Sequence, residues 1–169
     1  MQCGHMVRTT GERATGPTAA APSNCGCERP CEPGGRDDDG VRTLPIVWQR
    51  LVSDGVTCPR CAGTQIEVER AVTVLGDALR PLGIEPTLET LALDQSDFEA
   101  APDESNRILV AGRPLEDWIG ATASASECCS VCGANQCRTV EVDGRTFETV
   151  PASLIIKAGL LAAASLVDA

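Results

Sequence analysis

The chain has 169 residues, ten cysteines and a formal net charge of −10. This length suits one domain of ordinary size with a tail. The negative charge argues against a nucleic-acid partner, because such affinity comes largely from cationic contacts to phosphates, and it also disfavours anionic membranes. With two Phe, two Trp and no Tyr, the core must be built from aliphatic side chains.

Segments near the N-terminus and the C-terminus bear on the cellular location of the protein and on its association with membranes. The N-terminal segment lacks the apolar core of a signal peptide, so we expect a cytoplasmic protein, in a compartment that usually keeps thiols reduced. The apolar segment 151–167 contains Lys157 and is shorter than the roughly 20 residues of a membrane span. We therefore predict a helix buried against the sheet and no membrane partner.

Composition also divides the chain. Residues 1–42 are rich in Gly, Pro, Ala, Thr and charged residues and offer almost nothing apolar to bury, which predicts a disordered tail. The sequence then predicts one domain over residues 43–169. The one histidine, His5, lies in the tail, which argues against a Cys–His nucleophilic pair and against zinc sites that need histidine.

The first half of the predicted domain alternates strands with one strong helix. Residues 44–52, 87–93 and 107–111 have the pattern of strands, and residues 94–105 form an acidic loop or one short helical turn. Between the first two strands, apolar residues at spacings of three and four predict an amphipathic helix. Those residues are Val68, Ala71, Val72, Leu75, Ala78, Leu79 and Leu82, and the stop signals are Pro81 and Gly83.

The second half predicts a short helix, a hairpin and a final helix. Residues 115–119 suit a short helix, and Asp143-Gly144 predicts a type I′ turn between strands 138–142 and 145–150. These elements predict the α/β fold class, with a mixed sheet, helices on its faces and a C-terminal β-hairpin plus helix. The first strand–helix–strand unit should be a right-handed parallel crossover, and the later strands should extend that sheet in antiparallel fashion.

Cys58 and Cys61 form a Cys-x-x-Cys pair between a strand and a helix. If Cys58 is the N-cap, the positive helix end favours its thiolate, as in thioredoxin-like redox motifs. If the helix instead begins with a capping box at Thr64 and Glu67, both cysteines lie in a loop that resembles a zinc knuckle. The sequence does not decide between a helix capped by Cys58 and one that begins at Thr64.

Two further groups of cysteines lie outside this pair. Cys128, Cys129, Cys132 and Cys137 gather in one loop, where they suit a second relay pair or a soft-metal site. Neighbouring Cys128 and Cys129 rarely bind one tetrahedral zinc together, so one of them would be spare. The tail cysteines, Cys25, Cys27 and Cys31, are spaced so that they can wrap one soft cation without a fold.

Residues 44 to about 167 resemble a bacterial and archaeal family of thioredoxin-like domains of unknown function. Several motifs carry the resemblance, and the resemblance implies a thioredoxin-like fold without supplying a function. The motifs are Cys58-Pro-Arg-Cys61, Glu104-Ser-Asn-Arg107, Gly112-Arg-Pro-Leu-Glu116, the Cys128-Cys129 loop and the segment 151–162.

The chain departs from working thioredoxins at one position. They place a cis-proline before the strand that faces the Cys-x-x-Cys, whereas Asn106 stands there in this chain. That proline helps to present substrate and keeps metal off the thiols, so its absence favours metal binding.

The preferred hypothesis is a thiol-disulfide oxidoreductase in which Cys58 attacks and Cys61 resolves, acting on a protein or small-molecule disulfide without a cofactor. The alternatives are a non-catalytic protein that binds zinc, mercury(II) or arsenic(III) through thiolates, and a structural zinc domain.

Overall fold

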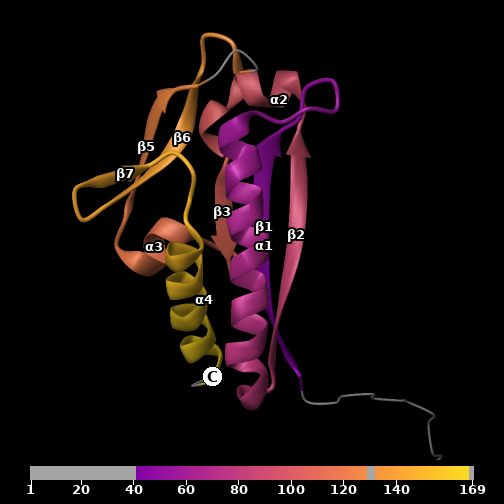
Figure 1. Cartoon of the computed structure of the whole chain (residues 1–169), viewed down its shortest axis with the longest axis vertical. Helices are drawn as coiled ribbons and strands as arrows, with labels where there is room; N and C mark the ends of the chain where they lie inside the picture. The colour runs from indigo at the N-terminus through magenta and orange to yellow at the C-terminus, as the bar shows by residue number, and fades with distance from the viewer. Residues whose placement is uncertain (1–40, 129–131, 168–169) are drawn as a thin grey trace, which may run out of the picture. The chain divides into compact units, whose positions relative to one another are not determined.

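The computed structural model describes residues 41–128 and 132–167, and Figure 1 draws their helices and strands. The predicted tail lies almost wholly outside these residues, so its disorder and the domain boundary near residue 43 stay predictions.

A four-stranded mixed sheet forms the centre of the described region. Strand β1 (Arg42–Leu51) pairs in parallel with β2 (Ile84–Leu93) along ten residues, and antiparallel with β3 (Arg107–Val110). The two-residue strand β4 (Arg113–Pro114) completes the order β2-β1-β3-β4. This arrangement confirms the predicted parallel strand–helix–strand unit and the mixed sheet.

Helix α1 (Pro59–Leu79) connects the two parallel strands and lies beside α4 (Ala152–Val167), as Figure 1 shows. Both helices contact the first sheet, and their buried residues join the aliphatic core around Trp48. The two helices come very close at Gly159, where an added Cβ would lie 2.6 Å from Leu75 Cδ1. The final helix is therefore the predicted buried helix, which fits because Gly159 carries no side chain.

Shorter elements complete the connections. The 3-10 turn η1 (Arg80–Leu82) ends α1 at the left-handed Gly83, where the stop signals predicted it. Helix α2 (Gln95–Ala100) and the 3-10 turn η2 (Pro102–Glu104) occupy the acidic segment, and α3 (Leu115–Ile119) matches the predicted short helix. Among the described helices, none is long and apolar enough to cross a membrane.

The predicted hairpin is present but lies in a second sheet. Strands β6 (Gln136–Val142) and β7 (Arg145–Phe147) meet at Asp143-Gly144, whose φ angles of 52° and 70° are both positive, as a type I′ turn requires. Strand β5 (Thr122–Glu127) pairs with β6 to give the order β5-β6-β7. The prediction that these strands extend the first sheet was therefore wrong.

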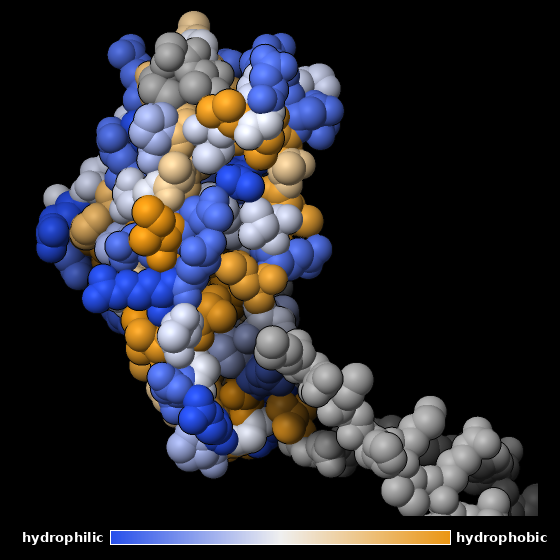
Figure 2. All heavy atoms as spheres, turned by 45° about the vertical axis from the view of Figure 1, so that its right-hand side comes forward, coloured by the Kyte–Doolittle hydropathy of each residue, from blue (hydrophilic) through white to orange (hydrophobic). Residues whose placement is uncertain are grey.

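The end of the first sheet explains this difference. Its edge strand β4 has only two residues, and the second, Pro114, has no N–H to donate to a further strand. Strand β5 escaped prediction because its sequence, Thr-Ala-Ser-Ala-Ser-Glu, alternates only small alanines with polar residues, and most of the strand is exposed. On the face drawn in Figure 2, apolar and polar residues are interspersed over the surface.

Candidate thiolate site

Cys58 is the N-cap of α1, and this decides between the two possible helix starts. Its backbone is extended, with φ −71° and ψ 157°, and Pro59 follows as the first helical residue. The Cys58 Sγ accepts a hydrogen bond from the Cys61 backbone N–H at 3.4 Å. The start at Thr64 was therefore wrong, and Cys58 faces the positive end of a 21-residue helix.

Thr64 and Glu67, which resemble a capping box, accept hydrogen bonds from a distant part of the chain instead. Thr64 Oγ1 accepts a hydrogen bond from the Val150 N–H at 3.2 Å, and a Glu67 carboxylate oxygen accepts one from the Ala152 N–H at 2.8 Å. These contacts fasten the start of α4 to α1. They also explain the glycine inside α1, because a Cβ at Gly63 would lie 3.0 Å from Thr149 Oγ1.

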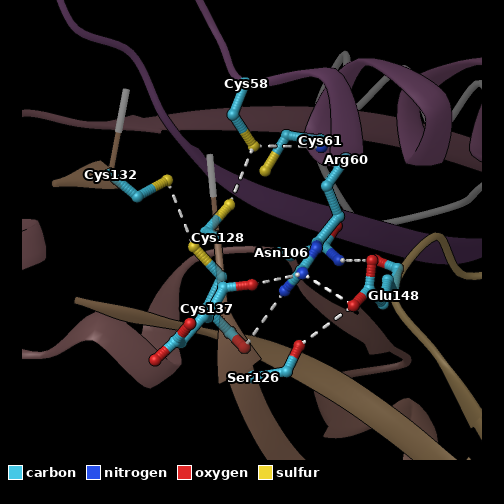
Figure 3. Close-up of polar contacts among 10 residues, drawn as sticks. Cys58, Arg60, Cys61, Asn106, Ser126, Cys128, Cys132, Cys137 and Glu148 are labelled. Carbon is cyan, nitrogen blue, oxygen red and sulfur yellow. Dashed lines mark hydrogen bonds and ion pairs between the residues drawn. The ribbon is translucent and has the colours of Figure 1, made fainter. Parts of the chain in front are cut away.

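Four sulfur atoms converge in front of this helix start (Figure 3). The Cys128 Sγ lies 3.7 Å from the Cys58 Sγ, and the Cys137 Sγ lies 3.2 Å from the Cys132 Sγ. The ligand atoms of Cys58, Cys128 and Cys132 all lie within 4.8 Å of one another. We call these three residues the thiol trio; they come from the start of α1, the end of β5 and the segment before β6.

The trio joins cysteines that the sequence placed in separate sites. Cys61 stays outside it: its buried Sγ lies 3.9 Å from the Ser105 Oγ, which in turn accepts a hydrogen bond from the Leu51 N–H. Cys129 and the tail residues Cys25, Cys27 and Cys31 lie outside the described residues.

Arg60, which sequence reasoning did not single out, joins the start of α1 to the ends of β5 and β6 and to Glu148. Its side chain is 8% exposed and forms an ion pair with Glu148 at 3.0 Å. It also donates hydrogen bonds to the main-chain oxygens of Glu127 at 2.9 Å and of Cys137 at 3.5 Å. The available signal was its position between Cys58 and Cys61, but its partners lie at least 67 residues away in sequence.

Asn106 stands immediately before β3. Its φ of 62° is left-handed, and the residue is buried. The side-chain oxygen accepts a hydrogen bond from Trp48 Nε1 at 3.5 Å, and the side-chain nitrogen donates to the Glu148 main-chain oxygen at 3.1 Å. Asn106 therefore links the first sheet to the segment that carries the partner of Arg60.

Among the three trio residues, Cys128 is the one that solvent reaches. Cys58 is 1% exposed and Cys132 fully buried, whereas Cys128 is partly exposed and lines a cleft of about 420 Å³. The other residues that line this cleft are Pro59, Arg60, Glu127, Glu148 and Thr149. A small ion or molecule would meet Cys128 first, and a bulky partner would not reach the Cys58 sulfur without rearrangement.

The thiols differ in acidity. The hydrogen bond from the Cys61 thiol, helped by backbone N–H groups of the first helical turn, lowers the pKa of Cys58 to about 4 despite the opposing effect of burial. The Cys58 sulfur as hydrogen-bond partner, followed by burial, raises the pKa of Cys61 far above its usual range. Burial likewise raises the pKa of Cys132 strongly and that of Cys137 to about 12. Near neutral pH, Cys58 is therefore a thiolate, whereas Cys61, Cys132 and Cys137 keep their protons.

Comparison with known proteins places the chain in a family. It belongs to the family described as domain of unknown function (DUF2703), whose model matches residues 44–159. It is also 46% identical over 112 residues to an uncharacterised protein of Archaeoglobus fulgidus, a match that covers 66% of this chain and 82% of the relative. No solved structure matches at a significant level. These findings confirm the predicted resemblance to a family of unknown function with an archaeal member, while its thioredoxin-like character stays a prediction.

Proposed function

We propose that this member of the DUF2703 family binds a soft metal or metalloid ion through the thiolates of Cys58, Cys128 and Cys132. One observation carries the proposal: three sulfur ligand atoms, one from the start of α1 and two from the β5–β6 connection, lie within 4.8 Å of one another. Thiolates prefer soft ions such as zinc, mercury(II) or arsenic(III) over magnesium or calcium, which prefer oxygen.

The distances support this reading. With Zn–S bonds of about 2.3 Å, two ligands of a tetrahedral zinc lie about 3.8 Å apart. The Cys58 and Cys128 sulfurs are 3.7 Å apart, so this pair already has the required spacing. The third sulfur must move by no more than about 1 Å to reach the same spacing, starting from the 4.8 Å limit of the group.

The pKa values of Cys58 and Cys132 also suit the binding of a metal ion. The lowered pKa of Cys58, near 4, supplies one anionic ligand before any ion arrives. Cys132, whose pKa is raised by burial, loses its proton when the ion's positive charge replaces it. Binding should therefore release protons and weaken as the pH falls. A reducing compartment such as the cytoplasm would keep cysteines in the thiol form that ion binding needs.

Thiol–disulfide exchange is the second candidate, and a specific observation favours it. Cys58 is an N-cap thiolate with Cys61 one turn further into the helix, and the sheet order β2-β1-β3-β4 supports a thioredoxin-like relation. Cys58 would attack a disulfide and Cys61 would resolve it. The 1% exposure of Cys58 restricts such a reaction to small substrates, which is why ion binding ranks first.

Native mass spectrometry of the full chain, purified under reducing and chelator-free conditions, tests the proposal. We expect one bound ion that is lost in Cys58→Ser and Cys128→Ser but kept in Cys61→Ser, which removes a thiol outside the trio. A variant with Cys25, Cys27 and Cys31 changed to Ser should also keep it. An ion that survives Cys128→Ser, or ion-free protein that accepts no added cadmium(II), contradicts ion binding by the trio.

A further inference from the structure

Cys137 is a buried thiol that the proposed ion site does not use. Its Sγ lies 3.2 Å from the Sγ of Cys132, which belongs to the trio, and both side chains are fully buried. The Cys132 sulfur thus has both the trio sulfurs of Cys58 and Cys128 and the Cys137 sulfur as neighbours.

We propose that Cys132 and Cys137 form a reversible dithiol–disulfide couple, and that its oxidation removes Cys132 from the ion site. The first part concerns a redox site of its own, and the second rests on the proposed function. The substrate of the couple would be a small disulfide, or a small thiol in the reverse direction.

The local geometry supports bond formation between these two sulfurs. A disulfide needs a sulfur–sulfur distance of about 2.05 Å, so the pair must close by roughly 1 Å. A tight turn holds the two residues near each other: Gly133 has a φ of 62°, and the Asn135 N–H donates to the Cys132 main-chain oxygen at 3.3 Å. Cys137 is fixed in β6 opposite Ser126 of β5.

Cys128 supplies the route from solvent to this buried pair. It is partly exposed in the cleft, and its Sγ lies within 4.8 Å of the Cys132 Sγ. As a thiolate it would attack a small disulfide RSSR, giving a mixed disulfide at Cys128 and one RS⁻.

Two further exchange steps complete the reaction. The Cys132 sulfur then attacks the Cys128 sulfur as the Cys132 proton passes to the first released RS⁻, and the second RS⁻ leaves. The Cys137 sulfur attacks Cys132 as the Cys137 proton passes to the second RS⁻, which returns Cys128 to its starting state. The net change is two cysteine thiols and RSSR to one Cys132–Cys137 disulfide and two RSH, so the cysteines lose the two electrons that RSSR gains.

Oxidation and ion binding then compete for one sulfur. A disulfide sulfur is not a thiolate ligand, so the oxidised protein would retain two of the three ligands. By linkage, if the oxidised form no longer binds the ion, an ion present at 100 times its dissociation constant should shift the equilibrium about 100-fold towards the dithiol, which equals about 59 mV for this two-electron couple.

The test uses the full-length protein with Cys3, Cys25, Cys27 and Cys31 changed to Ser, so that only thiols of the predicted domain react. Bis(2-hydroxyethyl) disulfide is the oxidant, because it is neutral and the cleft carries two glutamates. After treatment and gel filtration, peptide mapping identifies the disulfide, and titration with cadmium(II) measures binding through sulfur-to-metal absorbance.

Two single variants in that background act as matched controls, because each removes a buried thiol outside the trio. The parent and Cys61→Ser should form the Cys132–Cys137 disulfide, lose cadmium binding at least tenfold and regain it on reduction. Cys137→Ser cannot carry out the last exchange step, so peptide mapping should find Cys132 joined to Cys128 in place of the Cys132–Cys137 disulfide. A Cys58–Cys61 or Cys58–Cys128 disulfide as the first product in the parent overturns the inference.

The two proposals fail separately. If the reduced protein binds no cadmium, the proposed function and the coupling both fall, while peptide mapping still decides whether Cys132 and Cys137 form the couple. If cadmium binds and the Cys132–Cys137 disulfide forms without changing the affinity, the proposed function stands and the coupling is wrong.

Discussion

A carboxylate oxygen of Glu67 accepts a hydrogen bond at 2.8 Å from the N–H of Ala152, the first residue of α4, across 85 residues of sequence. The carboxylate satisfies a backbone donor that the helix itself cannot, and its negative charge faces the positive helix end. We expect Glu67→Ala to lower the free energy of unfolding by about 1–2 kcal/mol. Chemical denaturation measures the change. The exposed neighbour Glu69 provides the control, since Glu69→Ala should cost less than half as much.

Arg60 should control the affinity of the trio without touching its sulfurs. Arg60→Gln removes the ion pair with Glu148 and loosens the ends of β5 and β6 from α1. Residues that position ligands typically change metal affinity about 10–100-fold, and we expect a loss in that range for cadmium(II). Arg80→Gln is the control, because the Arg80–Asp77 pair is exposed and distant in sequence from every described thiol. Equal affinity in both variants would show that Arg60 does not position the site.

The acidity of Cys58 has a pH dependence with a definite sign. Its pKa is lowered to about 4 in the folded protein and lies near 8.5 in an unfolded chain. A lowered pKa stabilises the fold fully above the unfolded value, and that stabilisation disappears as the pH falls through the folded value. The ion-free protein should thus lose stability between about pH 8.5 and 4 by more than Cys58→Ser does, because serine does not titrate there.

Ultraviolet absorbance of the thiolate provides the direct measurement. Ion-free protein should show one thiolate that disappears near pH 4 and is missing in Cys58→Ser. Cys61→Ala should move that transition to higher pH, because the Cys61 hydrogen bond is the largest cause of the lowered pKa of Cys58. A transition that stays in place in Cys61→Ala contradicts this assignment.

Two helical glycines should respond in opposite ways to alanine. Gly159→Ala places a Cβ 2.6 Å from Leu75 Cδ1 and should destabilise the fold by about 1–3 kcal/mol through overpacking. Gly76→Ala meets only Pro86 Cγ, at an ordinary 3.9 Å, and should stabilise α1 by about 0.5–1 kcal/mol. Thermal unfolding of the two variants checks both signs, and a stabilised Gly159→Ala would show that α4 can move away from α1.

Features determined by neighbouring residues could be predicted from the sequence. The turn at Asp143-Gly144 follows from two residues that tolerate positive φ, and α3 was predicted with the bounds that the structure has. The start of α1 could not be fixed, because Thr64 and Glu67 mimic a cap of their own helix while they bind the segment before α4 and its first residue. The sequence does not show which backbone groups a side chain will meet 85 residues later.

The sequence allowed the reactive and ligating residues of the candidate site to be identified, but not their arrangement in space. Cys58 and Cys128 were each identified as reactive or ligating residues, yet their 3.7 Å contact depends on packing the second sheet beside the start of α1. No local periodicity encodes that packing. Arg60 and Ser105 contribute through single long-range hydrogen bonds and contacts, which leave no pattern in one sequence.

The contact between Cys58 and Cys128 also bears on the conformational entropy of the chain, because it closes a segment with a sequence separation of 70 residues. Bringing the ends of such a segment together costs an unfolded chain about 4 kcal/mol in entropy. The folded domain has already lost that freedom before any ion arrives. An unfolded chain with the same thiols would therefore hold an ion across these two positions roughly a thousandfold more weakly. That difference is the amount by which an ion bound at the trio would favour the folded chain.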